Sequence, residues 1–147
     1  MKFKNILGIL IVVSLIIAVS GCISQNTANP KVLGDYNLSV SSGSPVIDKY
    51  IVLPNGTKSV TIEYSNITPV DIGMGADPTN FQFSTLNVVA QEGQSSTNYA
   101  ANIVDLKTVS TNSTPISGTV TLKTDGAKSV GIRDSLGKGN VKIIITQ

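Results

Sequence analysis

Short runs of β-branched and apolar residues, separated by Gly, Pro, Asn and Asp, follow one another from residue 35 to the end of the chain. No segment of this part shows an apolar stripe at helical spacing. The pattern is typical of all-β domains. It predicts an antiparallel β-sandwich, immunoglobulin-like or jelly-roll-like, with about seven or eight strands. The predicted strands are 36–41, 46–53, 58–66, 80–90, 97–108, 116–124, 128–133 and 139–146.

Two glycine-containing turns predict hairpins between neighbouring strands. A two-residue loop of Asn55 and Gly56 suits the type I′ turn and would join the strands on either side of it. A three-residue loop at 124–126, with its glycine in the left-handed conformation, would join its flanking strands in the same way. Both registers bring apolar positions together, because Ile51 would face Val60 and Val120 would face Val130.

Two predicted strands lose their alternation partway along. In one, Phe81 and Phe83 alternate but Leu86 falls on the other face, and in the other the alternation through Ile103 shifts at Val104. Either a β-bulge or burial on both faces explains such a break. We prefer bulges, because sandwich strands often bend as they cross an edge.

Residues 1–22 have a different pattern. A basic head, 1–5, is followed by an almost wholly apolar run, 6–19, that ends in small residues. These are the parts of a secretory signal peptide, and the run is short for a membrane span, which needs about 20 apolar residues. We expect a hydrophobic N-terminal helix that is removed on export. An uncleaved N-terminal anchor is the alternative.

The end of the apolar run, Val19-Ser20-Gly21-Cys22, resembles the lipobox of prokaryotic lipoprotein signal peptides. The resemblance covers only residues 1–22. It implies a lipid on the sulfur of Cys22 and a mature chain that begins there, on the outer face of the cytoplasmic membrane. The expected organisation is therefore a signal peptide at 1–21, a lipidated cysteine and flexible tether at 22–34, and the β-sandwich at 35–147.

Removing the leader changes the composition. Without Lys2 and Lys4, the 11 Lys and Arg residues fall to nine, which equals the 9 Asp and Glu residues. The remaining chain is neutral overall, so no nucleic-acid partner is expected. It also has no cysteine besides Cys22, and the chain contains no histidine, which excludes a Ser-His-Asp or Cys-His catalytic arrangement. We therefore expect a protein that is not an enzyme.

One loop, 71–80, is a candidate calcium site. Asp71, Asp77 and Asn80 offer oxygen ligands on a segment that glycines make adaptable, and Ca²⁺ takes such ligands. The spacing differs from that of an EF-hand. An ordinary connection between strands is the alternative, and no other cofactor is expected.

Four Asn-x-Ser/Thr sequons offer sites for N-glycosylation in an exported protein, provided that the cell has an oligosaccharyltransferase, as many archaea do. A chain rich in Asn, Ser and Thr also produces sequons by chance. The bias toward Ile, Asn, Lys and Ser is similar in style to that of methanogen surface lipoproteins. The four acceptor residues are Asn37, Asn55, Asn66 and Asn112.

These features predict a cell-surface lipoprotein held to the membrane by a lipid on Cys22 or by an uncleaved N-terminal helix. Its sandwich would act as a non-catalytic binding or structural module of the envelope, with an envelope protein or a glycan as partner. The alternative is a calcium- or glycan-binding module that uses the 71–80 loop. Tyr50 is a candidate for stacking on a sugar if it faces outward.

Overall fold

The computed structural model describes residues 29–41, 43, 46–71, 73, 78–91 and 96–147. The predicted N-terminal helix, Cys22 and Asp77 lie outside these residues. Within them, no helix has the length and apolarity needed to cross a bilayer. The described part of the chain contains eight strands and one short helix: β1 Lys31–Ser39, β2 Val46–Val52, β3 Ser59–Pro69, β4 Thr79–Leu86, α2 Ser96–Ala101, β5 Ile103–Thr111, β6 Ile116–Leu122, β7 Ser129–Ser135 and β8 Gly137–Thr146.

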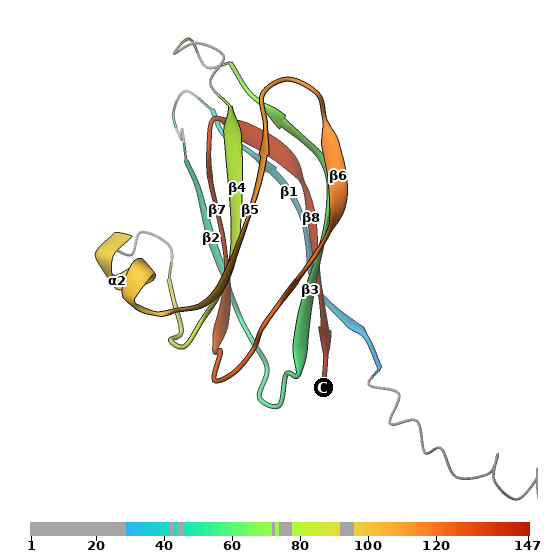
Figure 1. The fold of residues 1–147 in the computed structure, drawn as a ribbon, viewed down its shortest axis with the longest axis vertical. Helices are drawn as coiled ribbons and strands as arrows, with labels where there is room; N and C mark the ends of the chain where they lie inside the picture. Colours follow the sequence, from blue (N-terminus) through green and yellow to red (C-terminus); the bar gives the residue numbers. More distant parts are fainter. Residues whose placement is uncertain (1–28, 42, 44–45, 72, 74–77, 92–95) are drawn as a thin grey trace, which may run out of the picture.

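The strands form two four-stranded antiparallel sheets that pack face to face, as predicted (Figure 1). One sheet has the order β1-β8-β3-β6 and the other has the order β2-β7-β4-β5. Strand β1 pairs with β8, β2 with β7, β3 with β6, and β4 with β5. Successive pairs in this nested series lie in alternate sheets. This arrangement is the jelly roll of the two predicted alternatives.

The core fills the space between the inner faces of the two sheets. The side chains of the core come from alternate residues of the strands. Every second residue of β8 and β3 points inward from one sheet, and every second residue of β4 and β7 points inward from the other. The fully buried side chains of this core are Val60, Ile62, Ile67, Phe81, Phe83, Val130, Ile132, Val141, Ile143 and Ile145.

Both predicted hairpins are wrong. The turns at 54–57 and 124–127 each connect one sheet to the other, because β2 pairs with β7 and β3 pairs with β6. In the first turn Gly56 has a φ of 80° and Asn55 stays at negative φ, so the type I′ turn of a tight hairpin does not form. Ile51 therefore faces Val130, and Val60 faces Leu122.

The predicted strand at 97–108 is also wrong over its first half. Ser96–Ala101 is the helix α2, and the strand begins only at Ile103. At Leu86, the alternation breaks because both faces of β4 are buried. Phe83 points into the sandwich, whereas Leu86 lies on the outer face and packs with Ala90 and Tyr99. In the neighbouring strand β5, Asp105 pairs with Thr85 and Ile103 pairs with Leu86. Val104 lies between them without a partner in the register, as in a β-bulge.

The start of the domain is earlier than predicted. Lys31–Gly34, which we assigned to the tether, belong to β1 and pair with the end of β8. Leu33 is bulged out of this register, and the ring of Tyr36 lies against Gly34 where a Cβ atom would stand. Gly34 is thus a packing position of the sheet, and its apparent role as a linker glycine was misleading.

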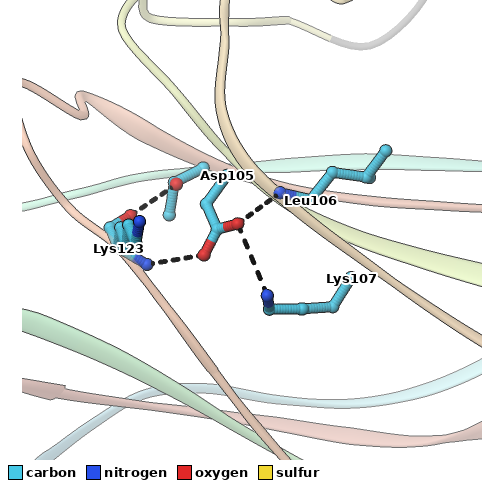
Figure 2. A network of polar contacts seen from close by, with 5 residues as sticks. Asp105, Leu106, Lys107 and Lys123 are labelled. Carbon is cyan, nitrogen blue, oxygen red and sulfur yellow. Dashed lines mark hydrogen bonds and ion pairs between the residues drawn. The ribbon is translucent and has the colours of Figure 1, made fainter.

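Polar contacts join the two sheets along both open sides of the sandwich. On the side of β5 and β6, Asp105 accepts hydrogen bonds from the backbone N–H groups of Leu106 and Lys123, at 2.9 and 3.0 Å (Figure 2). These bonds, led by the one from Lys123, lower the pKa of Asp105. On the side of β1 and β2, the ammonium group of Lys49 lies 4.7 Å from the ring centroid of Tyr36.

Candidate functional site

The outer face of the sheet β2-β7-β4-β5 carries the most elaborate set of polar side chains among the described residues. Residues that face each other across neighbouring strands point to the same side of a sheet. Register therefore places Asp48, Arg133, Gln82 and Thr108 in one row across all four strands. The segment that contains α2 covers part of this face (Figure 1).

Arg133, the one arginine of the chain, is fixed at the centre of this row. Its Nε lies 3.2 Å from Oδ1 of Asp48, and both side chains are about three-quarters buried. Its guanidinium carbon lies 4.5 Å from the ring centroid of Tyr99, which comes from α2. A cation held by a carboxylate and an aromatic face is pre-organised, so little entropy is lost when it binds a further group.

Two tyrosines pack beside Arg133 at the foot of α2. The rings of Tyr50 and Tyr99 lie 6.1 Å apart, and the Tyr99 hydroxyl group bonds to the Ser84 hydroxyl at 2.8 Å. Burial raises the pKa of both tyrosines, and the nearby Asp48 carboxylate raises the pKa of Tyr50 further. The Tyr50 hydroxyl group is buried without a hydrogen bond of good geometry.

Tyr50 thus faces outward from the sheet, as the alternation predicts, but Tyr99 covers it. Its ring packs over Gly131, whose missing side chain leaves the space. These contacts weaken the sugar-stacking hypothesis for Tyr50, because they leave its ring only partly exposed.

A groove of about 490 Å³ lies on the same face, on the side of Arg133 away from Tyr50. Polar groups and apolar carbon atoms contribute similar shares of its walls, and the polar groups are amide, hydroxyl, guanidinium and carboxylate groups. The Asn80 side-chain oxygen accepts a hydrogen bond from Ser110 at 2.6 Å, which orients the amide. The residues that line the groove are Val46, Asn80, Gln82, Thr108, Arg133, Asp134 and Ser135.

Asp134 is the least expected member of this region. It is 4% exposed, and its carboxylate accepts hydrogen bonds from the Thr79 hydroxyl at 2.8 Å and the Asn80 backbone N–H at 3.0 Å. Burial nevertheless raises its pKa, because desolvation outweighs these bonds. The carboxylate ties the end of β7 to the start of β4 and thereby fixes one wall of the groove.

The two described members of the predicted calcium set, Asp71 and Asn80, have different hydrogen-bond partners. The Asp71 carboxylate accepts a hydrogen bond from Gly73 N–H at 2.8 Å, which forms a local turn. The Asn80 side chain lies in the groove and bonds to Ser110. Asp77 lies outside the described residues. Among the described residues, no group of three Asp, Glu, His or Cys side chains is placed to hold a metal ion.

The four sequon asparagines are all exposed, at different places on the sandwich. Asn37 lies on β1, Asn55 in the turn between β2 and β3, and Asn112 directly after β5. Asn66 occupies a bulge of β3 with a φ of 55°, a left-handed conformation that asparagine tolerates. Their accessibility is compatible with modification, and it does not distinguish among them.

Sequence reasoning missed both Arg133 and Asp134, although each had a signal. Val130 and Ile132 are apolar and alternate, so Asp134 falls on the inward face of the same strand. By the same parity, Arg133 falls on the outward face.

No protein-family model matches this chain, and no curated protein matches it at a significant level.

Proposed function

We propose that the protein is a cell-surface lipoprotein, anchored through Cys22, whose jelly roll is a non-catalytic module that binds a component of the envelope. The observation that carries the proposal is the lipobox-like end of the apolar run at Cys22. The absence of histidine from the chain supports a binding role over a hydrolytic one. The outer face of the cytoplasmic membrane is the proposed location.

The groove beside Arg133 supports the binding part of the proposal. It combines a fixed cation with amide and hydroxyl groups, and such groups recognise polar partners through hydrogen bonds. An envelope protein would be recognised through carboxylate or backbone carbonyl groups at Arg133. The partner would thus contact β7 and β4, at the face that α2 leaves open.

Glycan binding at the same groove is a second candidate, favoured by the lining itself. Asn80, Gln82 and Thr108 present the amide and hydroxyl groups that hydrogen-bond to sugar hydroxyls. A calcium-dependent version would add the 71–80 loop, through Asp71, Asp77 and Asn80. Excess calcium would then raise the melting temperature, and an unchanged melting temperature removes the metal from the proposal.

The anchor is tested by Cys22→Ser. We expect the wild type to be processed and to enter the detergent phase of a phase-partition experiment. The variant should remain an uncleaved precursor or move to the aqueous phase. Identical processing and identical mass of the two proteins, apart from the substitution, would contradict lipidation.

The binding role is tested by photo-cross-linking in native membranes. We expect the double variant Gln82→Ala/Thr108→Ala, in the groove, to lose cross-links that the wild type forms. The matched control is Thr119→Ala/Thr121→Ala, on exposed positions of β6 in the other sheet. Equal loss in both variants, or no loss in either, would mean that the groove is not the binding surface.

A further inference from the structure

The end of the sandwich where β1 begins also carries the two turns that cross between the sheets (Figure 1). Leu53 N–H donates to the Lys128 carbonyl group at 2.9 Å, and the Thr124 hydroxyl donates to the Lys58 carbonyl group at 2.8 Å. Lys58 N–H bonds in turn to the carbonyl group of Thr146, near the end of β8. These bonds hold the two turns as one rigid surface.

Four exposed lysines surround this surface: Lys31, Lys58, Lys123 and Lys128. None of them forms an ion pair with another described residue. The nearby Asp105 carboxylate is already occupied by the N–H groups of Lys123 and Leu106 and by the Lys107 ammonium group at 3.7 Å (Figure 2). Among the described residues near the two turns, the exposed anionic side chain that opposes the lysines is that of Asp125.

Apolar side chains lie inside this ring of charge. A hollow of about 340 Å³ separates the two turns, and Val52 and Val89 line it with exposed fractions of 56% and 54%. We call Val52, Val89 and the four lysines the basic end. Exposed valines ringed by lysines are the composition of surfaces that rest on a lipid interface, where the ammonium groups meet phosphates and the apolar groups enter the headgroup region.

The opposite end of the sandwich has the reverse charge. Its described charged residues are Asp71, the buried Asp134 and Lys138. Charge is thus distributed unevenly along the molecule, with an excess of lysines at one end. An anionic surface would orient the molecule with that end toward it.

The anchor brings the basic end to such a surface. Eight residues separate Cys22 from Lys31, so the chain between them spans at most about 30 Å even when fully extended. The ten residues of β8 place the other end about 30 Å farther away. The lipid and the basic end therefore reach the same bilayer together, which supplies the two signals that stable peripheral binding needs.

We infer that the basic end docks on the anionic phospholipid bilayer to which the chain is tethered, so that the groove beside Arg133 and the end that carries Asp71 are presented away from the membrane. Lys31, Lys58, Lys123 and Lys128 contact lipid phosphates, and Val52 and Val89 enter the interface. This inference rests on the proposed anchor at Cys22 and adds to it the orientation of the domain.

The test uses the full chain, purified from membranes and reconstituted in vesicles of phosphatidylcholine alone or with phosphatidylglycerol. A fluorophore is attached to Asn55→Cys, in a turn of the basic end, or to Asn112→Cys, at the opposite end. Lipids that carry a nitroxide on the headgroup quench a fluorophore that touches the surface. We expect quenching at position 55 on the anionic vesicles, little on the neutral ones, and little at position 112 on either.

Charge substitutions identify the lysines as the cause. Each lysine near an anionic surface strengthens binding about five-fold, so Lys58→Gln/Lys123→Gln/Lys128→Gln should weaken docking about 100-fold. The control, Lys49→Gln/Lys138→Gln/Lys142→Gln, removes the same charge elsewhere and should keep the quenching. High salt should act like the first triple variant.

Equal quenching at the two positions, equal quenching on neutral and anionic vesicles, or equal effects of the two triple variants would overturn the inference. The anchor is scored separately in the same preparation. A chain without an added cysteine takes up no fluorophore if a lipid blocks Cys22. If it is labelled, the anchor proposal fails, and docking is then measured in a Cys22→Ser background that the apolar leader holds in the membrane.

Discussion

Asp134 gives the sharpest test of the packing at the groove. Replacing it with alanine removes the acceptor for the Thr79 hydroxyl and for the Asn80 backbone N–H, at 2.8 and 3.0 Å. Each buried donor left without a partner costs about 1–3 kcal/mol, and the loss of a desolvated charge returns part of that cost. We expect Asp134→Ala to lower the free energy of unfolding by about 2–4 kcal/mol.

The raised pKa of Asp134 adds a pH signature with a definite sign. The folded state holds the carboxyl proton more tightly than the unfolded state, whose pKa stays near the ordinary 3.8. Stability from this group is therefore complete below that value and declines as pH rises through the higher, folded-state pKa. Asp134→Asn cannot titrate at this position. The unfolding free energy of the wild type minus that of Asp134→Asn should therefore fall as pH rises through this window.

The assay is urea denaturation of the chain from Ser24 onward, followed by circular dichroism from acidic to neutral pH. Comparison with Asp134→Asn cancels the titration of the other carboxylates. If the unfolding free energy of the wild type minus that of Asp134→Asn instead rises with pH, the hydrogen bonds to the Asp134 carboxylate outweigh the effect of burial on its pKa. A loss below about 0.5 kcal/mol for Asp134→Ala would mean that its donors find other partners.

Two further predictions concern α2 and the strand order. Tyr99→Ala should cost about 4 kcal/mol, because a buried aromatic ring that packs on Tyr50 and Arg133 is lost, whereas Tyr99→Phe loses only the bond to Ser84 and should cost about 1 kcal/mol. Equal losses in the two variants, measured by urea denaturation, would show that the ring contacts contribute nothing. Asn37→Cys/Asn140→Cys, on a facing pair of β1 and β8, should form a disulfide on oxidation and raise the unfolding free energy by up to about 4.7 kcal/mol. Failure of these cysteines to join in the folded protein would contradict the jelly-roll pairing.

The sandwich class was predictable from the sequence because alternation and turn residues report directly on short, half-buried strands. Strand pairing was not. The turn at Asn55 and Gly56 has a typical hairpin dipeptide, and apolar residues on both sides fit a hairpin register as well as they fit the observed partners. In this topology even the first strand pairs with the last, so local registers carry little information about the true neighbours.

The candidate site, likewise, could be predicted from the sequence only within single strands and not across neighbouring elements. The inward parity of Asp134 and the outward parity of Arg133 could have been read from Val130 and Ile132. The partners Asp48 and Tyr99 could not, because they come from β2 and α2, which only the folded chain brings to β7. Residues 97–101 were predicted as strand because they carry no apolar stripe at helical spacing, and a helix of six residues is too short to show one.

The central claim is that Cys22 carries the lipid that tethers this domain. Intact-mass measurement of the protein from native membranes, with sequencing of its N-terminal peptide, tests it most directly. We predict a chain that begins at Cys22 and is heavier than residues 22–147 by the mass of a lipid. A chain that begins at Met1 with a free Cys22 thiol would contradict the claim and leave the apolar run 6–19 as the anchor.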